Sequence, residues 1–262
     1  MLFVVKTKAK EINKTPNKIE LSTNAVEESS DKNWLYSDLS FRIAFGLTSF
    51  HGDIMQKKAV KPAFSVHLGI PIKNERYSLE VGFITGSISG QNSFSSLCEN
   101  PYHTIEGVLI EHPTEGERFN MEFMEFDINF LMNLSILFDD KIKKRVFKNE
   151  KLDLLCKVGV GLNMFRSLSK ELETEQFINS YGYEWMWQDD FSNAGTKKNN
   201  YVKEGVFVLG IIAKYKISDK VDIDFSVTSR IGNTDKWDTK IKGQNDMFMF
   251  YSLGTNFGLG KN

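Results

Sequence analysis

The sequence is poor in cysteine, proline and net charge. Its 262 residues include 2 cysteines and 5 prolines, and 33 Lys and Arg stand against 34 Asp and Glu. Two cysteines cannot build a disulfide framework or a metal cluster, so we expect Cys98 and Cys156 to be free thiols. Balanced charges leave no basic excess to neutralise phosphates, which argues against nucleic acid as a partner.

A long apolar run is also missing, which excludes a helical membrane protein. The most apolar stretch, Gly205–Ala213, is far shorter than the roughly 20 residues that a spanning helix needs. The aromatic content of 13% excludes a wholly disordered chain. Such averages describe an ordinary globular protein, but they also fit a transmembrane β-barrel, in which alternating polar and apolar residues cancel in any window.

The N-terminal residues show no strand or helix pattern. The apolar start Met1–Val5 is too short for a signal peptide core, yet Thr7 and Ala9 have the spacing of a cleavage site. One interpretation is a signal remnant cut after Ala9, and the other is an ordinary polar N-terminus; the mass of the native protein would decide between them. We expect residues 1–37 to be a signal remnant and flexible periplasmic tail, and residues 38–262 to be the folded domain.

From Asp38 onward the chain alternates with a period of two. In the first segment Phe41, Phe45 and the residues of their parity are apolar, whereas Arg42 and its parity are polar or small. This period predicts strands with two unlike faces. The alternating segments are residues 38–48, 60–73, 77–86, 124–134, 152–164, 206–217, 221–230 and 247–259. Eight strands joined by tight turns and long loops are typical of an antiparallel up-and-down barrel in an outer membrane.

The volume of the apolar side chains decides which face points outward. The inside of an eight-stranded barrel holds on the order of a dozen large side chains, fewer than the apolar parity carries. A soluble barrel or sandwich would have to bury them all, whereas a membrane barrel exposes them to lipid. No charged residue falls on this parity, as expected when a lipid-facing charge costs about 2–4 kcal/mol. The predicted lipid-facing residues include Phe41, Phe45, Phe64, Phe126, Phe130, Phe207, Phe225 and Phe257.

The opposite parity predicts a lumen with nearly balanced charges. The predicted inward charges are Arg42, Lys61, Glu80, Glu125, Asp127, Asp153, Lys157, Lys214, Asp222, Asp224 and Arg230. Buried charges must pair or change protonation state, so we expect a salt-bridge network that plugs the lumen. The alternative is that the same charges gate a narrow conductance. His67 lies on this parity and is expected to be a satisfied lumen histidine.

The loops offer one candidate binding surface and no catalytic motif. The aromatic side chains of Tyr181, Tyr183, Trp185 and Trp187 form either an extended strand with interfacial packing or a platform for a glycan or protein partner. His103 and His112 do not have the spacing of a zinc motif. Asp189 and Asp190 could be combined with His51 into a hydrolase site, but no sequence feature places them together. We predict no catalytic residue, metal or cofactor.

The eight amphipathic segments resemble the small outer-membrane barrels of the OmpA N-terminal-domain type. The resemblance covers about residues 38–259, and Arg230–Asp238 followed by residues 245–259 resembles the final loop and closing strand of such barrels. It implies a barrel in the outer membrane of a diderm bacterium. It also implies contact with outer-membrane lipid and, during biogenesis, with the barrel-assembly machinery, for which Phe257 is the candidate terminal aromatic. The C-terminal peptidoglycan-binding domain of many family members has no counterpart here, so we do not expect attachment to the cell wall.

These observations predict a non-enzymatic outer-membrane barrel. We expect a structural anchor or a subunit of an envelope assembly, such as a secretion or surface-motility complex, with a protein partner of unknown identity. The alternatives are a narrow pore or ligand-binding barrel and, third, an outer-membrane enzyme. Conductance would distinguish the second possibility, and activity on lipid or peptide substrates the third.

Overall fold

The structure is a computed structural model. It describes residues 39–52, 57–72, 76–92, 102–105, 108–111, 116–134, 151–175, 177–183, 197–239 and 245–259. Its strands are β1 (Ser40–His51), β2 (Lys57–Ile72), β3 (Tyr77–Asn92), β4 (Tyr102–Ile105), β5 (Val108–Glu111), β6 (Glu117–Asn133), β7 (Leu152–Glu171), β8 (Phe177–Tyr181), β9 (Val202–Lys216), β10 (Val221–Gly232) and β11 (Met247–Gly258). Within these residues, no helix is long and apolar enough to cross a bilayer.

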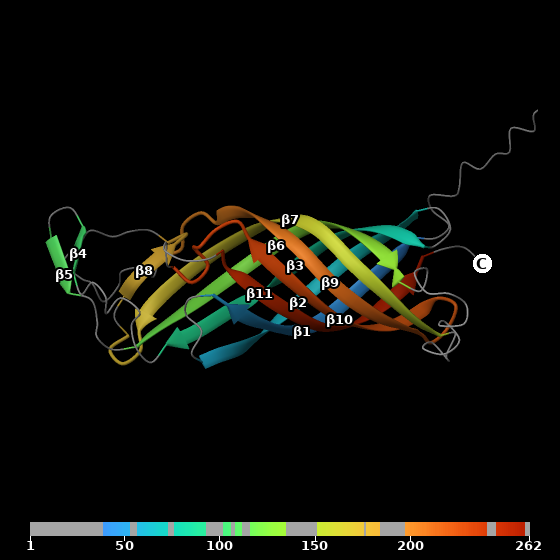
Figure 1. Cartoon of the computed structure of the whole chain (residues 1–262), viewed down its shortest axis with the longest axis horizontal. Coiled ribbons are helices and arrows are strands. Elements are labelled where there is room, and N and C mark those ends of the chain that lie inside the picture. Colours follow the sequence, from blue (N-terminus) through green and yellow to red (C-terminus); the bar gives the residue numbers. More distant parts are fainter. Residues whose placement is uncertain are drawn as a thin grey trace, which may run out of the picture. The chain divides into compact units, whose positions relative to one another are not determined.

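Eight of the strands close into an antiparallel barrel, as predicted. The order is β6-β3-β2-β1-β11-β10-β9-β7, and the β6–β7 pairing closes the ring (Figure 1). The first and last strands pair along their whole length, from Ser40 opposite Gly258 to His51 opposite Met247. Each of the eight segments that alternate in the sequence corresponds to one barrel strand. The three further strands were not predicted: β8 extends the sheet beside β7, and β4 and β5 form a separate hairpin.

The barrel has a turn end and a loop end. At the turn end β2 connects to β3, β6 to β7 and β9 to β10, and at the loop end β1 connects to β2, β3 to β6, β7 to β9 and β10 to β11. Between the two ends, the outward side chains form a belt of exposed large apolar residues, among them Phe45 at 67%, Val160 at 62% and Leu253 at 62% exposure. A soluble barrel would bury these residues. The apolar parity therefore faces outward, as the volume argument predicted.

The predicted lipid-facing phenylalanines all lie on this outer face. Those that are exposed are Phe45, Phe126, Phe130, Phe207, Phe225 and Phe257. Phe41 and Phe64 are half-buried, and the Phe64 ring packs against Phe45 with centroids 5.0 Å apart. Cys156 lies on the same parity as a free thiol. The predicted tail, residues 1–37, and Cys98 lie outside the described residues.

Several strands continue past their predicted ends toward the loop end. There the polarity of the two faces is inverted: on β6, Glu122 points outward, whereas the inward Phe119 and Phe123 are fully buried. The prediction of a strand over residues 124–134 left out the first part of β6, because it assumed that apolar residues face outward and polar residues inward along the whole strand. Phe248 and Phe250 broke that rule in the sequence for the same reason. They face inward and are buried where the wall leaves the lipid.

Candidate functional site: a layered lumen and its closure loop

The middle of the lumen is a layer of charged side chains, and Arg42 and Asp224 form its first pair. The Arg42 Nε lies 3.0 and 2.9 Å from the two Asp224 oxygens, and the guanidinium also donates to Ser226 and Ser252. Both charged groups are buried, at 5% and 1% exposure. A bidentate geometry of this kind is the strongest arrangement that a buried guanidinium and carboxylate can form. The pair joins β1 to β10 across the intervening strand β11.

A second group of charges lies on β2, β3, β6 and β7. Lys157 forms an ion pair with Glu80, whose carboxylate is also 3.1 Å from His67 Nδ1. The other neighbour of His67 is Asp127, at 4.0 Å. All four side chains are buried. The histidine therefore lies inside the charge layer as expected, but among the described residues its Nε2 has no hydrogen-bond partner, so the expectation that it is fully satisfied is not confirmed.

Arg230 forms the third group and connects the charge layer to the aromatic residues above it. Its guanidinium lies 2.9 Å from Glu125 and 3.7 Å from Asp127, and it donates to Thr228. The Phe248 and Phe250 rings lie 5.7 and 5.3 Å from the guanidinium carbon. A cation next to two rings gains electrostatic attraction as well as dispersion. Arg230 is thus held by carboxylates on one side and aromatic rings on the other.

Glycines on the strands between the partners make room for these pairs. A Cβ on Gly254 would press against both the Arg42 and Asp224 side chains that cross β11. A Cβ on Gly82 would collide with His67 and Asp127, which meet across β3. The glycine-rich inward parity seen in the sequence therefore has a specific use. The absence of a Cβ lets side chains from the two strands on either side of the glycine strand contact each other inside the barrel.

The remaining predicted lumen charges lie toward the rims. Lys214 and Asp222 are 3.8 Å apart and partly exposed, and Asp153 accepts a hydrogen bond from Asn133 at 3.1 Å. Lys61 is half-buried on β2, and among the described residues it forms no ion pair. Seven of the eleven predicted charges are thus brought together in the buried layer, and these four are not: Lys61, Asp153, Lys214 and Asp222.

At the turn end, the lumen holds a small cavity and a small apolar cluster. The cavity has a volume of about 40 Å³ and is lined by charged groups that include Arg42, Glu80 and Lys214. Leu131, Leu155 and Ile212 pack together there. A space of this size holds a few water molecules at most. Side chains thus fill most of this end of the lumen.

At the loop end, the lumen is filled by a large apolar cluster that sequence reasoning missed. The cluster has Trp237 at 0% exposure in its middle, with Phe165 at a centroid distance of 6.5 Å and Phe248 at 5.4 Å. Its buried members are Phe50, Ala63, Ile84, Ile88, Phe119, Met121, Phe123, Phe165, Val206, Val208, Trp237, Phe248 and Phe250. The parity of Phe248 and Phe250 was the sequence signal for it.

Trp237 belongs to the connection between β10 and β11, which we call the closure loop, residues 233–246. Its described residues are tied to the barrel wall. Ser167 Oγ on β7 donates to the Trp237 carbonyl at 2.5 Å, and Asn179 Nδ2 on β8 donates to the Thr239 carbonyl at 2.7 Å. The Trp237 amide donates to the Asp246 carboxylate at 2.8 Å. These bonds hold the indole in the barrel mouth.

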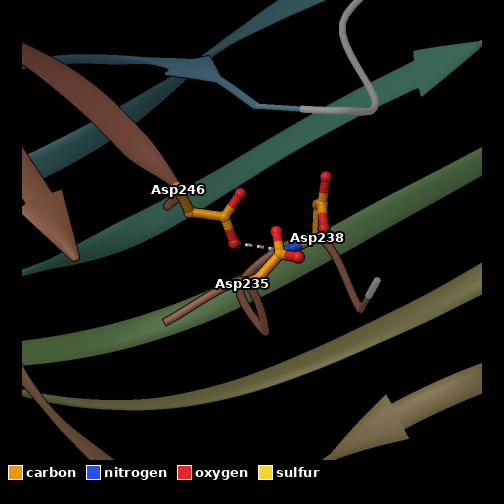
Figure 2. A group of neighbouring side chains, drawn as sticks. All are labelled: Asp235, Asp238 and Asp246. Carbon is orange, nitrogen blue, oxygen red and sulfur yellow. Dashed lines mark hydrogen bonds between the residues drawn. The ribbon is translucent and has the colours of Figure 1, made fainter. Parts of the chain in front are cut away.

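Three carboxylates of the closure loop converge, as Figure 2 shows. Atoms of Asp235, Asp238 and Asp246 lie within 4.8 Å of one another, and Asp238 and Asp246 are fully buried. Burial first, and then the neighbouring Asp238 and Asp235 carboxyls, raise the pKa of Asp246 to about 8. Oxygen ligands of this kind are those that a hard cation such as Ca²⁺ prefers. The cluster therefore has the chemistry to hold either a shared proton or a cation.

The shifted pKa of Asp246 predicts a closure loop that loosens at alkaline pH. Because this pKa of about 8 in the folded chain lies above the ordinary value of 3.8, the proton favours the folded loop. The stabilisation is complete below about pH 4 and is lost as the pH rises through about 8. Hydrogen exchange of the Trp237 and Asp238 amides, corrected for intrinsic rates, should therefore accelerate as the pH rises from about 4 to about 8 and level off above that.

Asp246→Asn keeps an acceptor for the Trp237 amide but cannot ionise, so its corrected exchange should not depend on pH. The matched control is Asp219→Asn, which removes a carboxylate that is 99% exposed in the turn end. It should behave like the wild-type chain. Equal pH dependence in Asp246→Asn and the wild type would contradict the assignment.

The predicted loop platform is only partly described. Tyr181 ends β8 and packs against the apolar cluster, and Tyr183 forms an isolated bridge with Lys198. Trp185, Trp187, Asp189 and Asp190 lie outside the described residues, as do His112 and the side chain of His103. The platform hypothesis, with its alternative of simple interfacial packing, stays a prediction. So do the expected absences of a catalytic residue, a metal and a cofactor.

Comparisons with known proteins found matches among solved structures only. No protein-family model matches the sequence, and no curated protein matches it. Among solved structures, Neisserial surface protein A is 9% identical with a TM-score of 0.41, covering 84% of this chain and 96% of that one. Ail of Yersinia pestis is 9% identical with a TM-score of 0.41, covering 85% and 99%. The N-terminal β-barrel domain of Pseudomonas aeruginosa OprF is 10% identical with a TM-score of 0.39, covering 84% and 98%.

The closed ring of eight strands and the outward apolar belt make this chain a small β-barrel of the outer-membrane type. Barrels of this type belong to the outer membrane of diderm bacteria.

Proposed function

We propose that this barrel is a non-catalytic structural anchor or a subunit of an envelope assembly, with a lumen plugged by its own side chains. The observation that supports the plug is the stacking of two filled layers. The buried charge layer around Arg42, Glu80 and Arg230 lies beneath the apolar cluster around Trp237. When the lumen of a barrel is filled, the surfaces that can contact other molecules are its rims, its loops and its outer wall. An assembly role uses those surfaces and needs no passage through the barrel.

The plugged lumen predicts electrical silence. Purified chain reconstituted into planar bilayers should show no steady large conductance, because moving a buried ion pair or the Trp237 cluster out of the lumen is costly. A steady large conductance would refute the plug and favour the pore alternative. Heat-modifiable gel mobility of the same sample shows that the recorded protein is a folded barrel.

The anchoring role is tested by identifying what co-purifies after gentle detergent extraction of the native membrane. Trp185→Ala combined with Trp187→Ala tests whether the loop aromatics make the contact. Loss of a reproducible partner with unchanged heat-modifiable mobility would support the platform. Unchanged partner recovery would argue against it and direct attention to the N-terminal tail or the wall.

A further inference from the structure

The outer wall carries a one-sided group of cations just beyond the apolar belt. On β7 the outward residues run through Leu162 and Met164 to Arg166, and on β9 Lys203 lies opposite Met164. Lys203 is exposed, and Lys198 lies on the segment that precedes β9 in the chain. We call Arg166, Lys198 and Lys203 the boundary cluster. Since it continues the outward face of the belt, it lies at the level where acyl chains give way to lipid headgroups.

On three other strands the outward residues at this level are uncharged, whereas β6 and β7 carry two further outward cations closer to the loop end, Arg118 and Lys170. The outward residues that follow the belt toward the loop end are Ser49 on β1, Ser87 on β3 and Ser229 on β10. One acidic residue accompanies the cluster: Glu122 forms an ion pair with Lys198, with Nζ and Oε2 2.7 Å apart. Three cations against one carboxylate leave an excess of positive charge on one side of the barrel.

Arg166 is held in place before any ligand arrives. Its guanidinium carbon lies 3.7 Å from the centre of the Tyr201 ring, and its Nε donates to the Asn199 carbonyl at 2.9 Å. Gly182, with a φ of +78°, brings its backbone so close to the Arg166 stem that a Cβ there would collide with Cγ. These contacts fix the aliphatic stem of Arg166, the stacking of its guanidinium on the Tyr201 ring, and its Nε. The two terminal nitrogens of the guanidinium remain as a planar fork, which matches the geometry of phosphate oxygens.

The position and charge of this cluster point to one occupant. We propose that the boundary cluster binds the phosphates of an anionic lipid headgroup in the leaflet on the loop side. The source is the phosphorylated glycolipid that fills the outer leaflet of an outer membrane, not a free phosphate. The apolar belt below would hold its acyl chains while Arg166 and Lys203 take the headgroup charge. This inference rests on the proposed outer-membrane location.

The test compares Arg166→Gln/Lys203→Gln with a matched double variant at the other rim, Lys216→Gln/Lys220→Gln, whose cations are exposed in the turn end. Full-length chain is placed in nanodiscs that contain phosphorylated lipid A, lipid A without its phosphates, or phosphatidylcholine. Native mass spectrometry then counts the lipids that remain bound. We expect the wild type and the turn-end variant to retain phosphorylated lipid A, and the Arg166/Lys203 variant to retain it about tenfold more weakly.

Equal retention by the Arg166/Lys203 variant would overturn the inference, and so would equal retention of lipid A without phosphates by the wild type. Binding of an acidic protein at this face with no lipid preference would also overturn it. Heat-modifiable mobility in phosphatidylcholine discs separates this result from the proposed function. A wild-type chain that inserts into no bilayer overturns the outer-membrane barrel itself, whereas a folded barrel without headgroup preference overturns only the boundary cluster.

Discussion

Replacing Arg230 with methionine is expected to destabilise the folded barrel by about 3–5 kcal/mol. The substitution keeps much of the side-chain volume beside Phe248 and Phe250 but removes the cation that faces Glu125 and Asp127. Both carboxylates are buried, at 0% and 1% exposure, so neither can recover its interaction with water. Urea titrations of the refolded chain in lipid vesicles, followed by heat-modifiable mobility, give the free energy of unfolding.

Two further variants isolate the cause. Lys236→Met breaks the half-exposed pair with Glu204 and should cost less than about 1 kcal/mol. Adding Glu125→Gln and Asp127→Asn to Arg230→Met should recover part of the loss, because no uncompensated charge remains inside. If Arg230→Met and Lys236→Met have equal effects, the buried charge layer does not stabilise the barrel as we argue.

Trp237→Ala is expected to release the closure loop, at a cost of about 3–5 kcal/mol. The indole is fully buried among Phe165 and Phe248, and alanine leaves a cavity that the rigid barrel wall cannot fill by collapse. The loop, not the ring of strands, should open. Trypsin should therefore cleave after Lys236 in the variant while the barrel retains its heat-modifiable mobility.

Trp237→Phe is the conservative control, since a ring of similar shape keeps most of the packing with the neighbouring aromatics. It should resist cleavage almost as well as the wild-type chain. If Trp237→Ala resists trypsin equally, the closure loop is held by its hydrogen bonds to Ser167 and Asn179 and not by the indole.

The sequence predicted the barrel because one physical rule governs most of its wall. Lipid outside and a crowded polar lumen inside force a two-residue period, and this period located all eight barrel strands. The same rule identified the seven charges of the buried layer, because a charged residue on the inward-facing parity of a strand must lie inside the barrel. It could not say which charges pair: Arg42 meets Asp224 across a strand and 182 positions of sequence.

The loop end could not be predicted because the rule reverses there. Once a strand leaves the lipid, water lies outside and the closure loop inside, so apolar residues such as Phe119 and Phe123 turn inward. Trp237 gave no periodic signal because it lies in a connection, not a strand. The convergence of Asp235, Asp238 and Asp246 depends on the folding of that loop, which spacing in the sequence does not specify.

The pairs that cross a strand have a consequence for how the chain folds. Arg42 and Asp224 meet across β11, so their contact needs the pairing of β1 with β11, the first and last strands of the barrel. Contacts of such long sequence separation form slowly. A slip of one residue in this pairing would turn the Arg42 guanidinium toward lipid, where a charge is costly. The buried ion pair with Asp224 is therefore compatible only with the observed registry of the closing strands.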